Sequence, residues 1–219
     1  MGKHLSQKVN VILPSVFIII CIVFYFFIIR PQQDYYYAHY VKINGIYLLK
    51  PLEISNFELI DNHSTTFTKN NLKGHWTLLF FGFTHCSVVC PTTMARLNET
   101  YKILEKTLPN KQLPQIVFIS IDPDHDSIDR LNQYVASFNP HFISAKTTIE
   151  KTAALEKQFH ATSTKILEEN QEPNLDTITH SSEIILVNPE ANIQAYFYYP
   201  PQSDRLAEDY HAILKKNRN

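Results

Sequence analysis

Residues 76–91 have the sequence Trp-Thr-Leu-Leu-Phe-Phe-Gly-Phe-Thr-His-Cys-Ser-Val-Val-Cys-Pro. The first six residues form a short apolar run, and its length and the flanking glycines favour a buried strand over a helix. Residues 92–108 then carry apolar side chains three or four positions apart, which predicts an amphipathic helix. The chain is therefore expected to form a strand, a loop and a helix in succession, with Cys86 in the loop and Cys90 at the start of the helix.

The remaining patterns predict an α/β domain around this unit. The predicted elements are a hairpin over 57–67, a second buried strand over 115–121, a helix over 128–138, a short strand near 141–144, a helix from Thr147 or Thr148 to 159, strands over 183–187 and 193–198, and a helix over 203–216. Residues 160–178 are polar and are expected to be irregular. This order predicts a thioredoxin-like fold, in which a central mixed sheet is flanked by helices and preceded by an N-terminal hairpin.

An uncharged apolar segment covers residues 11–29 near the N-terminus. As a helix it would span about 28 Å, which is close to the thickness of a bilayer core. A cleaved signal peptide would have a shorter apolar region followed by a cleavage site of small residues, which is absent here. Lys3 and Lys8 precede the segment, which favours an N-terminus inside the cell and an exported C-terminal domain.

We therefore expect the chain to have four parts. Residues 1–10 form a cytoplasmic N-terminus, and residues 11–29 form a single transmembrane helix that anchors the protein. Residues 30–54 form a juxtamembrane linker that is rich in Tyr, a residue expected near a bilayer surface. Residues 55–219 form the folded domain.

The composition argues against several classes of function. The formal net charge is −1 and the chain has no run of Lys or Arg, so no nucleic-acid partner is expected. Only 4 glycines are present, which argues against Gly-rich phosphate-binding loops. The spacing Asp122-x-Asp124-x-Asp126 matches the start of a calcium-binding loop, but Ser127 and Gln133 stand where that loop requires Gly and Glu. The aspartates are instead expected to form a strand-to-helix turn and to cap the helix.

Three cysteines are present, and Cys21 lies within the apolar segment. A disulfide between Cys86 and Cys90 would close too short a loop to add much stability, so a functional pair is expected. Pro91 suits a first helical turn, and the partial positive charge of a helix N-terminus favours a thiolate. Thiolates serve both disulfide exchange and the binding of soft metals such as Cu(I). A copper site would need a further ligand such as an imidazole, and the spacing alone favours metal binding and redox chemistry equally.

Three blocks of sequence resemble one protein family. The block Phe-Gly-Phe-Thr-His-Cys-x-x-x-Cys-Pro (81–91) resembles the signature of the Sco/SenC family of thioredoxin-like copper proteins. Residues 119–127, Ile-Ser-Ile-Asp-Pro-Asp-His-Asp-Ser, are similar to the second block of that family. Residues 179–181, Thr-His-Ser, followed by Ile-Leu-Val-Asn-Pro (185–189), are similar to the third. The blocks occur in the family's order, and the resemblance extends from about residue 57 to about residue 198.

The resemblance implies that Cys86, Cys90 and His180 are ligands of copper, as Cu(I) or Cu(II). Sco-like proteins deliver copper to the dinuclear CuA centre of cytochrome c oxidase or reduce the cysteines of that centre. The implied partner is therefore the oxidase subunit that bears the CuA site, together with other periplasmic copper chaperones or thiol reductases.

The implied role is that of a metallochaperone rather than an enzyme. The implied location is the inner (cytoplasmic) membrane, which the chain would cross once, with its soluble domain facing the periplasm. The alternative function is that of a thiol-disulfide oxidoreductase that uses the dithiol of Cys86 and Cys90.

The chain departs from the family pattern in two places. Ser87-Val88-Val89 replaces the usual Pro-Asp-Ile or Pro-Asp-Val between the cysteines, and Thr179 stands where many members have Asp. Neither change removes an implied ligand, but both change the surroundings that set thiolate pKa and copper affinity. His85 is expected to lie beside the site rather than to bind the metal. A peroxidase of the peroxiredoxin type, which shares the fold, would need an Arg near the loop, and the motif places none there.

Overall fold

The computed structural model describes residues 16–33, 40–165, 178–180 and 182–217. The chain divides into two compact units, Met1–Tyr40 and Val41–Asn219. In the first unit, residues 16–33 form a helix that is long and apolar enough to cross a membrane, with a mean hydropathy of 1.9. The helix continues past residue 29, where we expected the anchor to end. The wider π-helical turn η1 (Tyr25–Ile29) lies just before Pro31, and the helix continues through this proline to residue 33.

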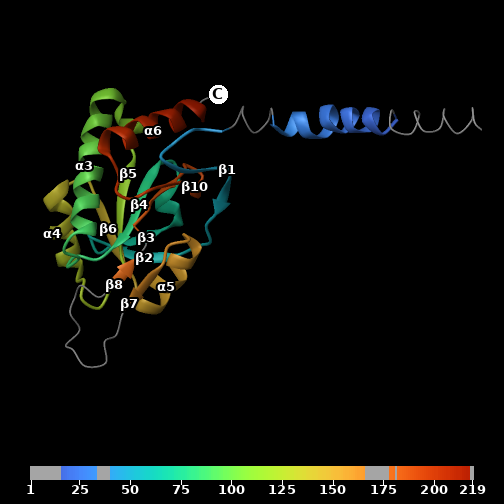
Figure 1. The fold of residues 1–219 in the computed structure, drawn as a ribbon. Helices are drawn as coiled ribbons and strands as arrows, with labels where there is room; N and C mark the ends of the chain where they lie inside the picture. Colours follow the sequence, from blue (N-terminus) through green and yellow to red (C-terminus); the bar gives the residue numbers. More distant parts are fainter. Residues whose placement is uncertain (1–15, 34–39, 166–177, 181, 218–219) are drawn as a thin grey trace, which may run out of the picture. The chain divides into compact units, whose positions relative to one another are not determined.

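Among the described residues, the second unit contains an eight-stranded mixed sheet with the order β1-β10-β9-β4-β5-β6-β2-β3 (Figure 1). Its strands are β1 (Gly45–Glu53), β2 (Glu58–Asp61), β3 (Thr66–Thr68), β4 (Thr77–Gly82), β5 (Gln115–Ser120), β6 (Ile143–Lys146), β9 (Ile184–Val187) and β10 (Asn192–Phe197). The central strands β4, β5 and β6 are parallel, whereas β9 and β10 pair antiparallel. A separate ladder joins β7 (Ser163–Lys165) to β8 (Ile178–His180).

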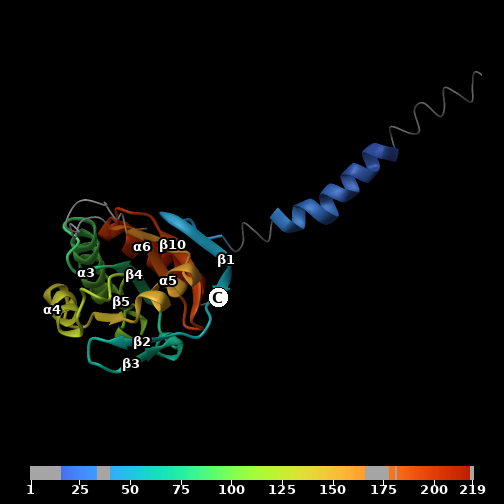
Figure 2. The same ribbon diagram turned by 90° about the horizontal axis from the view of Figure 1, so that it is seen from below.

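Helices cover both faces of the sheet, as Figures 1 and 2 show. They are α3 (Val89–Thr107), α4 (Ile128–Phe138), α5 (Ile149–Gln158) and α6 (Ser203–Lys216), with short 3₁₀ turns η2 (Lys69–Leu72) and η3 (Asn110–Gln112). On the α4 side, the ring of Tyr134 packs on Phe118 of β5 with ring centroids 5.4 Å apart. On the α5 side, Phe159 packs on Phe81 of β4 at 5.7 Å. The predicted mixed sheet flanked by helices is therefore confirmed.

The centre of the sheet fixes where the cysteine loop emerges. Strand β4 is buried along its whole length, which explains its continuous apolar sequence, since a parallel strand has covered faces on both sides. Strand β5 runs parallel to β4, with Leu79 paired to Val117. The loops that follow β4 and β5 therefore leave the sheet at the same edge, where ligand sites of α/β folds usually form.

Strand β1 corrects the predicted linker. Residues 45–53 lie within the predicted linker 30–54, yet they form an edge strand that pairs with β10. The folded unit accordingly begins at Val41 rather than at residue 55. A Cβ at Gly45 would stand 1.9 Å from the backbone oxygen of Tyr196, so only glycine allows the two strands to approach this closely. This pairing joins residues far apart in the sequence and leaves no local signal.

Two further elements differ from the predictions. The predicted hairpin is confirmed as β2 and β3, but it lies at the opposite edge of the sheet from β1, where β2 pairs with β6. Residues 160–178, expected to be irregular, include strand β7, which pairs with β8. The sequence of β7, Ser-Thr-Lys, is polar throughout, so it shows none of the apolar alternation by which strands are predicted.

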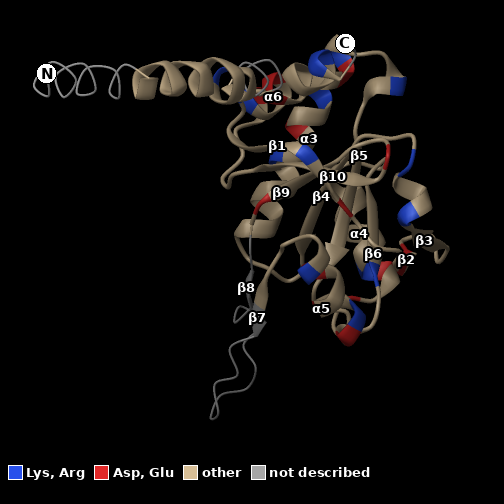
Figure 3. Cartoon of the chain, turned by 90° about the vertical axis from the view of Figure 1, so that its right-hand side faces the viewer, with Lys and Arg blue, Asp and Glu red and all other residues tan. Residues whose placement is uncertain are grey.

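The charged residues agree with the small net charge. Figure 3 shows Lys and Arg interspersed with Asp and Glu over the helices and strands rather than gathered into one basic surface.

Candidate metal centre

Both cysteines of the folded unit lie between the end of β4 and the first turn of α3. Cys90 lies in the first turn of α3 and is 0% exposed, whereas Cys86 is half-buried. A Cβ at Gly82 would stand 2.8 Å from Cys90 Sγ and 2.8 Å from Cε2 of Phe118. The missing side chain at Gly82 therefore lets the start of α3 pack directly on the end of β4. Val88, between the cysteines, is 62% exposed at the rim of the site.

The two sulfurs occupy different electrostatic surroundings. Both cysteines are thiols in the structure, and the backbone N–H of Cys90 donates a hydrogen bond to Cys86 Sγ at 3.4 Å. A helix N-terminus offers such N–H groups and a partial positive charge, so the Cys86 sulfur lies where a negative charge is stabilised. The hydrogen bond with Cys86 and then burial raise the pKa of Cys90 well above its usual range. Cys90 therefore keeps its proton until a partner that binds sulfur displaces it.

Asp126 holds the cysteine loop against the neighbouring strand. This carboxylate is 0% exposed and accepts hydrogen bonds from the hydroxyls of Thr84 at 2.5 Å and Ser120 at 2.6 Å. The backbone N–H of Thr84 also donates to it at 3.3 Å. The helix cap of α4 is Ser127, whose hydroxyl accepts from the N–H of Arg130. The predicted strand-to-helix turn is confirmed, but Ser127 caps the helix in place of the aspartates expected there. The prediction also missed that Asp126 holds the cysteine loop through its hydrogen bonds to Thr84.

His85 is held between a carboxylate and an aromatic ring. Asp122 Oδ2 lies 3.2 Å from His85 Nε2 and 2.8 Å from His125 Nδ1. The ring of His85 packs on Phe83 with centroids 4.8 Å apart. The contact with Asp122 lacks hydrogen-bond geometry, and both ring nitrogens of His85 are buried without a hydrogen-bond partner among the described residues. His85 thus lies within the cysteine loop, and its expected place beside the metal stays a prediction.

The third predicted ligand lies on β8. The backbone of His180 pairs with Ser163 of β7, but the side chain of His180 lies outside the described part of the chain, as does that of Thr179. Within the described residues, no group of three His, Cys, Asp or Glu side chains comes together that could hold a metal ion. The structure therefore brings Cys86 and Cys90 together, and His180 as their companion ligand stays a prediction.

The strand that pairs with His180 is attached to helix α5. Ser163 of β7 donates a hydrogen bond from its hydroxyl to Glu156 Oε2 at 3.0 Å, and Glu156 is only 7% exposed. Sequence reasoning missed this contact, because a Glu in a helix is ordinarily a solvent-exposed residue.

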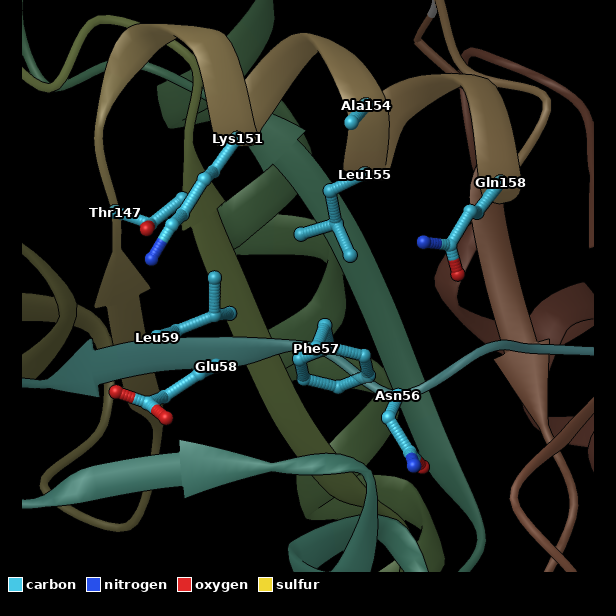
Figure 4. Close-up of a pocket in the computed structure, with 9 residues that line it drawn as sticks. All are labelled: Asn56, Phe57, Glu58, Leu59, Thr147, Lys151, Ala154, Leu155 and Gln158. Carbon is cyan, nitrogen blue, oxygen red and sulfur yellow. The ribbon is translucent and has the colours of Figure 1, made fainter.

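A cavity of about 420 Å³ lies between β2 and α5, away from the cysteines (Figure 4). Its polar lining consists of amide, hydroxyl, carboxylate and ammonium groups, from Asn56, Glu58, Thr147, Lys151 and Gln158. These groups do not form a set of soft ligands, so the cysteine loop is the candidate site.

Comparisons with known sequences agree with the resemblance of the motifs. A family model described as SCO1/SenC matches residues 48–215. The chain is 29% identical over 163 residues to the mitochondrial protein SCO2 homolog of Danio rerio, a match that covers 73% of this chain and 56% of that protein. It is 30% identical over 152 residues to an SCO2-like protein of Rickettsia prowazekii, covering 69% and 72% of the two chains. The chain thus spans little more than half of the first of these relatives.

Comparisons with solved structures confirm the predicted fold class. The structure of Arabidopsis thaliana ScoI with copper bound matches with a TM-score of 0.66 and 27% identity, covering 75% of this chain and 98% of that one. Bradyrhizobium japonicum ScoI with copper bound matches with a TM-score of 0.63 and 26% identity, covering 72% and 97%. Both of these structures contain copper.

Proposed function

Because the chain belongs to the SCO1/SenC family, we propose that it binds copper through Cys86, Cys90 and His180 and delivers it during the assembly of cytochrome c oxidase. The observation that carries this proposal is the pair of neighbouring thiols, half-buried Cys86 in the loop after β4 and buried Cys90 in the first turn of α3. The copper found in related ScoI structures supports it.

The donor set suits copper as a cargo. Two sulfurs and an imidazole match the preference of Cu(I) for soft ligands, and two sulfurs alone do not complete a zinc site. Copper must displace the proton that Cys90 holds tightly, which makes loading dependent on pH. The half-buried Cys86 is the sulfur that an incoming or outgoing partner reaches more easily.

We place the folded unit in the periplasm, tethered to the inner membrane by the N-terminal helix. The length and hydropathy of the helix at 16–33 support a membrane anchor, and Lys3 and Lys8 support an N-terminus in the cytoplasm. The proposed recipient is the oxidase subunit that bears the CuA site. Other periplasmic copper chaperones and thiol reductases are the proposed donors of copper and of electrons.

Copper stoichiometry tests the ligand set. The full-length chain in detergent micelles, carrying Cys21→Ser so that only two thiols remain, is expected to bind one copper ion. Cys86→Ser and Cys90→Ser should abolish tight binding, and His180→Ala should weaken it and change the absorption spectrum of the copper-loaded protein. His63→Ala, in the exposed turn between β2 and β3, is the control. If His180→Ala binds copper as tightly as the parent and with the same spectrum, the proposed three-ligand site is wrong.

A thiol-disulfide oxidoreductase is the second candidate, and the dithiol at a helix N-terminus favours it. The sulfur of Cys86 would attack a client disulfide, and Cys90 would then release the reduced client. Cys86 and Cys90 would lose two electrons and two protons to the two client cysteines. This function predicts disulfide exchange that survives His180→Ala but not Cys86→Ser. Restoration of oxidase activity in a deletion strain by added copper, but not by a reductant, would contradict it.

A further inference from the structure

The cavity between β2 and α5 has a volume of about 420 Å³, and the proposed copper site does not use it. This volume is in the range of ligand-binding pockets. Figure 4 shows Phe57 and Leu59 directed from β2 toward α5, and Leu155 directed from α5 toward them. Leu59 and Leu155 are buried and Phe57 is half-buried, so the floor of the cavity is apolar. Such a floor suits an apolar side chain of a ligand.

The cavity lies where β2 extends beyond the end of β6. The last residue of β6, Lys146, pairs with Ile60, and the chain then leaves the sheet to begin α5. Successive residues of a strand present their N–H and C=O groups to opposite sides. Asn62 donates its N–H to the carbonyl oxygen of Ser144 on the β6 side at 2.9 Å. Glu58, four residues before Asn62, therefore presents its backbone groups to the same side.

The backbone of Glu58 is thus an open part of the sheet edge beside the cavity. In the described part of the chain, Glu58 makes no backbone hydrogen bond with Thr147 or Thr148, the residues that follow β6. The side chain of Glu58 points away from α5, so it does not fill the cavity (Figure 4). An open N–H and C=O on a strand edge can pair with the backbone of an added peptide.

The two ends of the cavity carry different polar groups. At one end, the ammonium group of Lys151 extends from α5 toward β2, and it has no ion-pair partner among the described residues (Figure 4). At the other end, Oε1 of Gln158 accepts the N–H of Ser55 at 3.1 Å, so the amide nitrogen of Gln158 remains as a donor. A carboxylate suits the first end, and a peptide carbonyl suits the second.

We propose that this cavity binds the C-terminal end of a partner polypeptide. The carboxylate of the last residue faces Lys151, and the apolar side chain of that residue packs on Leu59 and Leu155. The backbone of the bound peptide pairs with Glu58 as an added strand, and a preceding carbonyl accepts from Gln158. This inference goes beyond the proposed function and does not depend on copper, since no residue that lines the cavity belongs to the cysteine loop.

Three peptides of equal length test the parts of this site. They are N-acetyl-Gly-Gly-Leu with a free carboxylate, the same peptide with a C-terminal amide, and N-acetyl-Gly-Gly-Gly with a free carboxylate. Each is titrated into the full-length chain in detergent micelles while NMR follows the backbone amide resonances of Glu58 and Leu155. The leucine peptide with a free carboxylate should shift both resonances and bind about fivefold more tightly than its amide. The glycine peptide should bind at least about tenfold more weakly, because it has no side chain for the apolar floor.

Variants of α5 separate the carboxylate contact from general changes in the helix. Lys151→Met should lower the affinity for the carboxylate peptide to that for the amide, and should leave the affinity for the amide unchanged. Lys157→Met, on the same helix but outside the cavity, is the matched control and should change neither affinity. Ala154→Trp, at an exposed position that lines the cavity, should abolish binding of the leucine peptide because its ring fills the space.

The inference is overturned if the leucine peptide leaves the resonances of Glu58 and Leu155 unshifted, or if its carboxylate and amide forms bind equally. It is also overturned if Lys151→Met behaves like Lys157→Met. A chain that binds the peptide but no copper would reject the proposed function alone, and a chain that binds copper but no peptide would reject this site alone.

Discussion

Gly82 is the position near the cysteine loop at which packing is expected to tolerate a substitution least. It ends β4, and the positions of Cys90 and Phe118 leave no space for a side chain there. Glycine is needed here for close approach rather than for backbone freedom, since the neighbours are a sulfur and an aromatic ring in a packed core. A residue that is not itself a proposed copper ligand thus decides where Cys90, one of the proposed ligands, lies.

Gly82→Ala is expected to destabilise the protein by about 1–3 kcal/mol, because a methyl group is forced into a filled space. It should also weaken copper binding, because Cys90 must move away from the end of β4. The checks are unfolding in urea and copper titration of the same sample. Gly74→Ala is the control: its Cβ would meet nothing within 4 Å but its φ of +79° is strained, so it should cost stability without changing copper affinity. Unchanged copper binding in Gly82→Ala would contradict the packing argument.

Asp126 is the second residue whose role depends on contacts made far along the chain. Asp126→Ala leaves the hydroxyls and the N–H that it accepts without their acceptor, so we expect a loss of about 2–3 kcal/mol in the free energy of unfolding. Asp124→Ala, two residues earlier and exposed, should change the free energy of unfolding by less than about 0.5 kcal/mol. Equal effects of the two variants in urea unfolding would show that Asp126 does not hold the cysteine loop.

At the scale of secondary-structure elements, the β7–β8 ladder sets the position of the His180 backbone. Helix α5 holds β7 through Glu156 and Ser163, and β7 in turn pairs with the backbone of His180. Two paired strands of three residues have little stability of their own. The hydrogen bond from Ser163 to Glu156 of α5 is therefore expected to contribute much of the stability of this ladder.

Ser163→Ala should therefore lower copper affinity severalfold while reducing the free energy of unfolding by no more than about 1 kcal/mol. The measurement is a copper titration with urea unfolding of the metal-free protein. Glu150→Ala, on the exposed first turn of the same helix, is the control and should leave copper affinity unchanged. A Ser163→Ala variant that binds copper like the parent would show that the ladder does not position the third ligand.

At the scale of the whole molecule, the two ends of the folded unit are tied together. Asp209 of α6 accepts the backbone N–H of Asn44 at 2.8 Å, just before β1, and Asn44 in turn accepts the N–H of Tyr198. Burial raises the pKa of Asp209, and the N–H of Asn44 and the charge of Arg205 oppose that shift only in part. A raised pKa in the folded state means that protonation of Asp209 favours folding, and that this contribution is lost as pH rises through the folded-state pKa.

Asp209→Asn is accordingly expected to be somewhat more stable than the parent at pH 7, since it removes a partly buried charge and keeps an oxygen for Asn44. The difference should shrink as pH falls through the raised pKa of Asp209 in the folded parent, because below it the parent carboxyl is also neutral. Thermal unfolding between pH 3 and pH 8 checks this. Asp209→Ala, which has no acceptor for Asn44, should be less stable than the parent at both ends of the range. A stability difference between Asp209→Asn and the parent that does not vary with pH would contradict the shift.

Local patterns in the sequence were sufficient to predict β4, α3, the β2–β3 hairpin and the strand-loop-helix setting of Cys86 and Cys90. Apolar periodicity, glycines and capping residues act within a few positions of one another, so they can be recognised without the fold. The edge strand β1, the hydrogen bonds from Thr84 to Asp126, and the packing of Tyr134 on Phe118 were decided by the tertiary structure alone. Each of these depends on groups that only the folded chain brings together, such as Thr84 and Asp126, which are 42 residues apart.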